Sequence, residues 1–117
     1  MILHIVSRAD WESALARGIY APPSLDTEGF IHCSTSAQIL RTANRFYRGQ
    51  RGLIILCIDE SRLEAAPRYE PPDHALSETS ADLFPHLYAP LNLDAIVQVI
   101  DFPCGADGTF EMPPALR

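Results

Sequence analysis

The chain has 117 residues and a mass of 13.0 kDa, enough for one domain with a single core over residues 1–117. Hydrophobic residues make up 47% of it and charged residues 21%, a globular composition, and no apolar run approaches the length of a membrane span. The formal net charge of -6 argues against non-specific nucleic-acid binding, because phosphate backbones attract basic surfaces. We expect a cytoplasmic protein with no membrane partner, because residues 2–6 are too short for the core of a signal peptide.

The first 18 residues predict a strand followed by a helix. Residues 1–6 form an apolar run typical of a strand, in which His4 replaces an expected hydrophobic side chain. Ser7 is placed to cap the helix that follows, and Gly18 provides the left-handed residue at which a helix commonly ends. The buried stripe of this helix is expected to contain Trp11, Ala14 and Leu15.

A proline-containing loop over residues 19–27 leads to the most informative stretch of the chain. Residues 30–33 predict a buried strand, because aromatic, β-branched and thiol side chains suit a pleated interior surface. A helix is expected from about residue 36 to residue 47, with Thr35 and Gln38 at the spacing of a capping box. A ligand phosphate or carboxylate could use the free backbone amides at the start of this helix.

The alternation of side chains along a strand determines what His32 can do. His32 shares one face of its strand with Phe30 and Ser34. Cys33 points to the opposite face, so His32 cannot serve as the base of a Cys33 nucleophile. We therefore interpret Cys33 as a core residue and His32 as a side chain that faces a ligand. The alternative is a buried histidine whose ring is hydrogen-bonded to a backbone carbonyl.

The three cysteines are too few and too scattered for a disulfide framework. Their number is odd, and Cys33 and Cys57 both lie in predicted strands. Free, buried thiols are expected at these two positions, in keeping with a reducing compartment. The sequence contains no Cys-x-x-Cys spacing, so a zinc site built on thiolates is not expected.

The middle of the chain contains the strand that the pattern predicts most clearly. Residues 53–59 are apolar and nearly unbroken, as in a central strand covered on both faces. One helical turn is expected within residues 60–66, and a brief strand over residues 68–70 is ended by two prolines. Residues 71–83 are polar, include His74 and predict a mobile surface loop.

The last third of the chain begins with an aromatic and histidine-containing segment. Its prolines are expected to hold residues 84–91 rigid, and with them His86. A strand is expected over residues 94–102, and Asp107-Gly108 is the type I′ turn signal of a final hairpin. The short strands and the late hairpin favour an α+β fold with a mixed or mostly antiparallel sheet.

Three histidines interrupt apolar segments, and a carboxylate lies near a predicted strand end. His4, His32 and His86 are the histidines, and Glu70 is the carboxylate. Three titratable rings at apolar-flanked positions favour a shared cleft over three separate core sites. Three histidines and a carboxylate would also suit zinc, but they lack the i, i+4 spacing of zinc-binding helices. The sequence contains no glycine-rich phosphate loop and no nucleophile elbow.

A set of longer motifs carries a family resemblance. The most specific of them is Glu28-Gly29-Phe30-Ile31-His32-Cys33-Ser34. The others extend over nearly the whole chain and comprise His4, Trp11, Pro23-Ser24-Leu25, Asn44-Arg45-Phe46-Tyr47, Ile58-Asp59, Tyr69-Glu70-Pro71, Phe84-Pro85-His86-Leu87-Tyr88 and Pro90-Leu91. With these motifs, the sequence resembles the bacterial family named domain of unknown function 952.

The resemblance implies an ADP-ribosyltransferase-like fold. In such a fold, two small mixed or antiparallel sheets with flanking helices enclose a central cleft. A polar residue of the first strand contacts the ribose of NAD, a residue of the second strand lines the nicotinamide pocket, and a later glutamate orients the ribose. By position, His4, His32 and Glu70 correspond to these three residues.

The leading hypothesis is a transferase-like enzyme that binds NAD or a related nucleotide in a cleft lined by histidines. Histidine and carboxylate groups would orient the ribose and stabilise positive charge as the glycosidic bond breaks. The candidate catalytic residues are His32, Glu70 and His86. The candidate cofactor-binding residues are His4, Arg8, Ser34 and Tyr88.

Three alternatives remain open at the level of the sequence. The first is a 2′-phosphotransferase-like activity on a phosphorylated RNA end, which the negative net charge disfavours. The second is a non-catalytic module that binds a nucleotide or another small ligand, because the paired-glutamate signature of ADP-ribosyltransferases is missing. The third is a metal-dependent enzyme that uses the histidines, although no tightly bound metal is expected.

Overall fold

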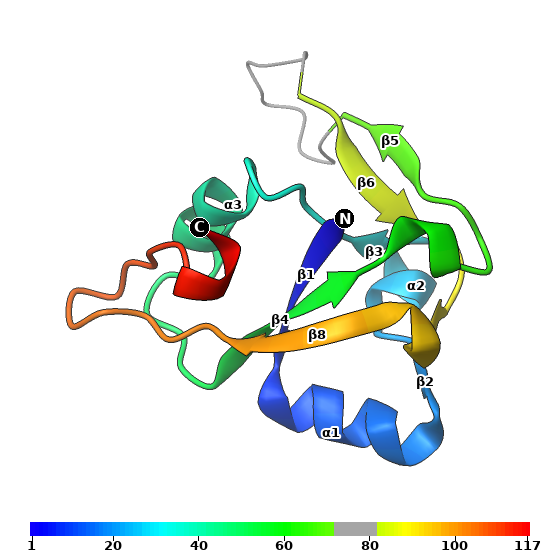
Figure 1. Cartoon of the computed structure of the whole chain (residues 1–117), viewed down its shortest axis with the longest axis horizontal. Coiled ribbons are helices and arrows are strands. Elements are labelled where there is room, and N and C mark those ends of the chain that lie inside the picture. The colour runs from blue at the N-terminus through cyan, green and yellow to red at the C-terminus, as the bar shows by residue number, and fades with distance from the viewer. Residues whose placement is uncertain (72–81) are drawn as a thin grey trace.

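Three small antiparallel sheets and three α-helices make up residues 1–71 and 82–117, the part of the chain that the computed structural model describes (Figure 1). The α+β class predicted from the sequence is confirmed, and all described strand pairs are antiparallel. The prediction of two sheets is wrong, because residues 19–20, expected in a loop, pair with residues 91–92 as a third sheet. In the described ranges, no helix has both the length and the apolar character that crossing a membrane requires.

The largest sheet has the strand order β1-β4-β8. Its strands are β1 (Ile2–Ser7), β4 (Leu53–Ile58) and β8 (Ile96–Asp101). Every residue of β4 is buried, because β4 lies between two other strands and side chains cover both of its faces. The central strand predicted over residues 53–59 is therefore confirmed.

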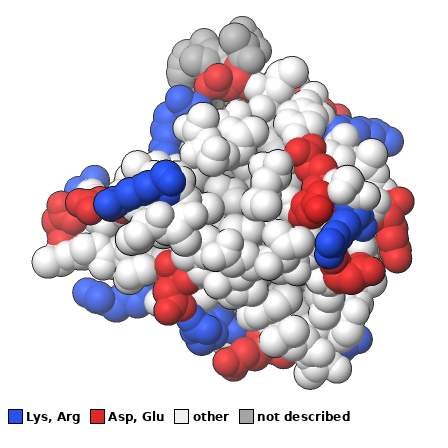
Figure 2. Space-filling view, viewed as in Figure 1, with Lys and Arg blue, Asp and Glu red and all other residues white. Residues whose placement is uncertain are grey.

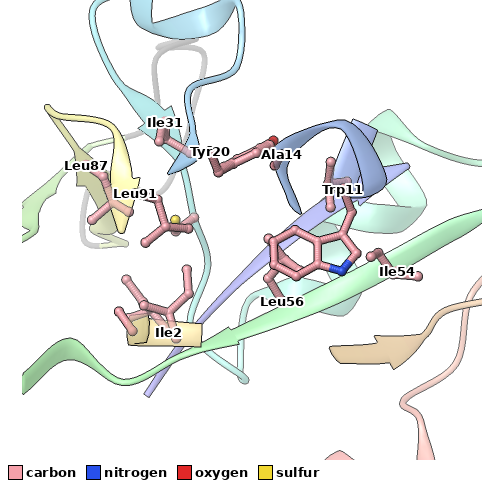
Figure 3. Packing of buried hydrophobic residues seen from close by; sticks show 13 residues of the cluster. Ile2, Trp11, Ala14, Tyr20, Ile31, Ile54, Leu56, Leu87 and Leu91 are labelled. Carbon is pink, nitrogen blue, oxygen red and sulfur yellow. The ribbon is translucent and has the colours of Figure 1, made fainter. Parts of the chain in front are cut away.

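Two hydrophobic clusters cover the two faces of this sheet. The first lies between the sheet, α1 (Arg8–Arg17) and the two smaller sheets (Figure 3). The second packs α3 (Ile39–Phe46) and the C-terminal segment against the opposite face. Neighbouring residues of a strand point to opposite faces, so Ile54 belongs to the first cluster and Ile55 to the second.

Two small sheets flank the first cluster. One pairs β2 (Ile19–Tyr20) with β7 (Leu91–Asn92), and α2 (Ser24–Thr27) leads from β2 towards the other. The second has the order β3-β6-β5 and consists of β3 (Ile31–His32), β6 (Phe84–Leu87) and β5 (Arg68–Glu70). The brief strand predicted over residues 68–70 is confirmed, whereas the strand predicted over residues 30–33 is only two residues long.

The local signals near the N-terminus are largely confirmed. Ser7 Oγ accepts a hydrogen bond from a backbone amide of the first turn of α1, and Gly18 ends the helix with a φ of 81°. Trp11 and Ala14 are buried as predicted, but Leu15 is 53% exposed, which contradicts the predicted stripe. Leu15 lies about 100° around the helix from Ala14, beyond the narrow arc that meets the sheet.

The start of α3 differs from the predicted capping box. The helix begins at Ile39 rather than near residue 36. The amide of Thr35 donates to Gln38 Oε1 at 2.9 Å, which is half of the predicted motif. In return, Thr35 accepts from Gln38 through its backbone carbonyl and not through its hydroxyl. The Thr35 amide is thus hydrogen-bonded to the Gln38 side chain, as the predicted capping box requires.

The predicted C-terminal hairpin is a turn without flanking strands. Gly108 has a φ of 84° whereas Asp107 has no positive φ, so the turn is not type I′. Asp107 Oδ1 instead accepts hydrogen bonds from the amide and the hydroxyl of Thr109. Phe102 and Phe110 stack with their ring centroids 4.6 Å apart, so side-chain packing closes this segment in place of a strand ladder.

Three short 3₁₀ helices complete the described structure. They are η1 (Glu60–Arg62), η2 (Leu93–Ala95) and η3 (Pro114–Leu116). The first confirms the helical turn predicted within residues 60–66, and the second replaces the start of the strand predicted over residues 94–102. Most of the surface loop predicted over residues 71–83, including His74, lies outside the described residues.

Candidate functional site

His32 and His86 are cross-strand neighbours in the β3-β6-β5 sheet. The antiparallel register pairs them directly, so both side chains project from the same face of the sheet. Their ring centroids are 5.8 Å apart, and the rings meet edge to face. Two of the three histidines singled out in the sequence therefore lie together.

Glu70 connects His86 to Tyr88. Because Arg68 pairs with His86 in the register, Glu70, two residues further along β5, projects from the same face. Glu70 Oε1 accepts a hydrogen bond from the Tyr88 hydroxyl at 2.5 Å and lies 2.8 Å from His86 Nδ1. These bonds, that of Tyr88 first, lower the pKa of Glu70 and keep its carboxylate ionised. An ionised carboxylate only accepts hydrogen bonds, so Nδ1 of His86 carries a proton.

Phe30 packs against the polar side chains of this face. Its ring is stacked on that of His86, with centroids 4.1 Å apart and 23° between the planes. The His32 ring lies 4.6 Å away and the Tyr88 ring 5.3 Å away. Because Phe30 is itself buried, it restricts the orientations that these rings can adopt.

His32 is the exposed member of the group. Its side chain is 46% exposed, and its Nε2 lies 2.8 Å from Glu28 Oε1. His86, by contrast, is buried. His32 is therefore the imidazole that a molecule arriving from solvent can contact. We refer to the whole group as the imidazole–carboxylate cluster, which comprises Glu28, Phe30, His32, Arg68, Glu70, His86 and Tyr88.

The cluster carries charges of both signs. Glu28 and Glu70 are its carboxylates, and the guanidinium of Arg68 lies 4.4 Å above the centroid of the Tyr88 ring. On the face of the molecule shown in Figure 2, arginine and acidic side chains are interspersed around an uncharged centre. A nucleic-acid backbone needs a continuous basic surface, which this mixed arrangement does not provide on that face.

His4 lies behind the cluster rather than in it. Its side chain is buried, and both ring nitrogens are hydrogen-bonded to protein atoms: Nδ1 lies 2.6 Å from the backbone oxygen of His32, and Nε2 lies 2.7 Å from the Tyr20 hydroxyl. Burial lowers the pKa of His4 to about 4. A ribose contact by His4, as the resemblance implied, would have to replace one of these bonds. The buried, carbonyl-bonded histidine considered as an alternative for His32 is found at His4 instead.

Ser34 and Arg8 also lie away from the cluster. Ser34 is buried, and its backbone forms a two-way bridge with Leu3, with both N–O distances at 2.8 Å. Arg8 begins α1 and pairs with Asp101 at the end of β8, in the largest sheet. Of the seven candidate residues named from the sequence, the structure brings together His32, Glu70, His86 and Tyr88.

Four residues near the site were not identified from the sequence as functional candidates. Period-2 alternation did place Phe30 on the His32 face, so its packing role could have been inferred. Glu28 and Arg68 depend on loop geometry and on strand pairing, which no local pattern reveals. Tyr20 was assigned to a loop, because a two-residue strand leaves no periodic signal.

The cysteines and the acidic side chains complete the chemical inventory. Cys33 and Cys57 are free and buried as predicted, and burial raises the pKa of both thiols. Neither is therefore a ready nucleophile. Within residues 1–71 and 82–117, no three His, Cys, Asp or Glu side chains are grouped so that they could hold a metal ion.

Solved structures of one similar protein share this architecture. The crystal structure of protein CC0527 from Caulobacter crescentus is 31% identical, with a TM-score of 0.83 over 98% of this chain and 96% of that chain. A crystal structure of a double mutant of CC0527 gives 30% identity and a TM-score of 0.82 over the same shares. The solution NMR structure of CC0527 gives 32% identity and a TM-score of 0.71 over 92% of this chain and 89% of that chain.

A family model covers most of the same region. It matches residues 5–99 and is described as "Protein of unknown function (DUF952)". A comparison with curated proteins found no match. The matched range contains every residue of the imidazole–carboxylate cluster, so the cluster lies within the family's shared domain. From the family match and the similarity to CC0527, we conclude that the chain belongs to the DUF952 family.

Proposed function

We propose that the imidazole–carboxylate cluster binds a nucleotide of the NAD type and that the chain is a transferase with an ADP-ribosyltransferase-like fold. The observation that carries the proposal is the convergence of an exposed imidazole, a buried imidazole, an ionised carboxylate and a phenol on one face of a small sheet. These groups come from three separate segments of the chain. A set of hydrogen-bonding side chains held around an aromatic ring is typical of a ligand site.

The hydrogen-bonding atoms left open suit a ribose. Both internal bonds of Glu70 end on Oε1, and in the described residues no partner contacts its Oε2. His32 uses Nε2 for Glu28 and has no partner for Nδ1 within the same ranges. A carboxylate accepts from a ribose hydroxyl, and an imidazole nitrogen can either donate or accept. The Phe30 ring is already stacked on His86. A planar base of the ligand would therefore stack on the exposed ring of His32.

The charge of Glu70 suits cleavage of a glycosidic bond. When the bond between ribose C1′ and the nicotinamide nitrogen breaks, its electron pair leaves with nicotinamide and positive charge develops on the ribose. An ionised carboxylate nearby stabilises that charge, and the lowered pKa of Glu70 ensures ionisation at neutral pH. An acceptor hydroxyl then forms the new bond to C1′, and His32 takes its proton as general base.

A non-catalytic nucleotide-binding module is the second candidate. This candidate is favoured because both carboxylates already have hydrogen-bond partners inside the cluster. Glu28 is bonded to His32, and Glu70 is bonded to His86 and Tyr88. Carboxylates held in this way can keep an imidazole oriented for binding without taking part in bond cleavage. The two candidates share the ligand and differ in whether nicotinamide is released.

A thermal-shift assay with NAD, ADP-ribose and 2′-phosphorylated nucleotides tests the binding step. Free ligand at about 100 times its Kd stabilises a fold by roughly 2.7 kcal/mol, which such an assay detects. His32→Ala should abolish the shift while leaving the fold intact, because the side chain is exposed. Gln98→Ala, at an exposed position of β8 in another sheet, is the matched control and should keep the shift.

Nicotinamide release from NAD then separates the two candidates. A ligand-induced shift together with free nicotinamide supports the transferase, and a shift without it supports the binding module. If the wild-type protein shows no shift with any nucleotide in the panel, both candidates fail. If His32→Ala binds as tightly as the wild type, the ligand lies elsewhere and the assignment to this cluster is wrong.

A further inference from the structure

The ring of His4 joins one strand from each of the three sheets. His4 belongs to β1, Tyr20 to β2 and His32 to β3. A backbone carbonyl can only accept a hydrogen bond, so His4 Nδ1 must carry a proton and donate it to the His32 oxygen, at 2.6 Å. In the neutral ring, Nε2 then has a lone pair and accepts from the Tyr20 hydroxyl, at 2.7 Å. The two contacts thus fix one tautomer and one ring orientation.

The His32 carbonyl needs this partner because it lies on the outer edge of its sheet. Backbone groups along a strand alternate between the two neighbouring sides. The Cys33 amide donates to Pro85 on β6, so the backbone groups of His32 and Ser34 point away from β6. Ser34 meets Leu3 of β1 on that side through two backbone bonds. At His32, two residues before Ser34, no backbone amide of β1 takes up the carbonyl oxygen. The ring of His4 donates a hydrogen bond to this oxygen instead.

The surroundings make this contact sensitive to change. His4 is 8% exposed and Tyr20 is 6% exposed, so water is largely kept from both. A buried donor or acceptor that loses its protein partner is not compensated by a hydrogen bond to water, so its loss lowers the free energy of unfolding. Burial also keeps His4 neutral, with a pKa of about 4, which agrees with the tautomer that the two contacts require. The ring is therefore a fixed support for the β3 backbone rather than a titrating group at neutral pH.

We propose that His4 and Tyr20 are positioning residues that hold the His32 backbone, and through it the exposed His32 imidazole, in the orientation needed for ligand binding. The positioning of His32 is inferred from the hydrogen-bond geometry, whereas its effect on nucleotide affinity rests on the proposed function. Neither side chain needs to touch the ligand. β3 has only two residues, and the next residue, Cys33, makes the backbone bond to β6, so the contact with His4 is what holds the carbonyl of His32 itself.

The test combines NMR of the His32 imidazole with nucleotide affinity in Tyr20→Phe, His4→Asn and His4→Ala. Tyr20→Phe removes the hydroxyl that orients the His4 ring. His4→Asn keeps an N–H donor close to where Nδ1 lies, whereas His4→Ala removes it. Ile55→Val, in the cluster on the opposite face of the largest sheet, serves as a control that changes the buried core away from His32. Because they retain more of the site, Tyr20→Phe and His4→Asn keep the test usable if His4→Ala does not fold.

We expect shifted or broadened His32 ring signals and about tenfold weaker nucleotide binding in Tyr20→Phe and His4→Ala. His4→Asn should lie closer to the wild type, and Ile55→Val should match the wild type in both measurements. Unchanged His32 signals in Tyr20→Phe and in the folded His4 variants would overturn the proposal, as would equal changes in Ile55→Val. If the wild type binds no nucleotide while the His32 signals still respond, the proposed function fails and the positioning of His32 by His4 holds.

Discussion

Acid should destabilise this protein in part through His4. The folded-state pKa of His4 is about 4, against 6.5 for an ordinary histidine, because burial disfavours the charged ring. Between these values the unfolded chain binds more protons than the folded chain, so the free energy of unfolding falls as the pH drops. The stabilisation is present above pH 6.5 and is lost progressively towards pH 4. At about 1.4 kcal/mol per pKa unit, the whole effect is about 3 kcal/mol, of which about 2 kcal/mol is lost by pH 5.

Urea unfolding of the wild type and of His4→Asn at pH 7, 6 and 5 measures this contribution. The variant should be less stable at pH 7, because the Tyr20 hydroxyl loses its acceptor, but its stability should fall less steeply with acid. The other ionisable groups are present in both proteins, so their contributions cancel in the comparison. If the wild type and His4→Asn lose the same free energy of unfolding between pH 7 and pH 5, His4 is not the source of this pH dependence. A wild-type stability that rises towards pH 5 would contradict the sign of the argument.

Three further predictions concern the site and the cysteines. Glu70→Gln keeps one oxygen that can accept from the Tyr88 hydroxyl but removes the charge, so nucleotide binding should persist while nicotinamide release falls at least about tenfold; equal release would exclude Glu70 from catalysis. Thiol labelling of the native protein should be fastest at Cys104 and slow at the two buried cysteines, and rapid labelling of Cys33 would contradict its place in the core. Chelation should leave the Tm unchanged, since the described residues contain no set of three or more His, Cys, Asp or Glu side chains that could hold a metal ion. Stoichiometric release of zinc together with a large drop in Tm would contradict this prediction.

The sequence predicts the elements whose signals are local. The apolar run at residues 53–58 needs no partner to be recognised, because a strand covered on both faces is hydrophobic throughout. Ser7 and Gly18 mark the ends of α1 for the same reason, since a cap acts over three or four residues. The pairing of residues 19–20 with residues 91–92 could not be found in this way, because it joins two dipeptides that are distant in the chain.

The site shows the same division between local and long-range signals. Alternation placed the side chain of His32 on the face that it occupies, and strand propensity identified residues 68–70. The direct pairing of His32 with His86 follows from the register of β3 and β6, which no single segment encodes. His4 has the same sequence character as His32, an imidazole inside an apolar strand. Only the neighbouring sheets decide that His4 is enclosed and that His32 is exposed.

The short strands that carry the site have a consequence for local opening of the molecule. The β3-β6-β5 sheet is built from strands of two to four residues, whereas β1, β4 and β8 have six residues each. Backbone amides in the small sheet should therefore exchange with solvent deuterium through sub-global openings, while those of β4 should exchange only when the whole domain unfolds. The binding free energy of a ligand at the cluster would then be measurable as slower exchange at the Cys33 amide, which donates to Pro85 and so joins β3 to β6. The site would have its own local stability, which a ligand can raise independently of the central sheet.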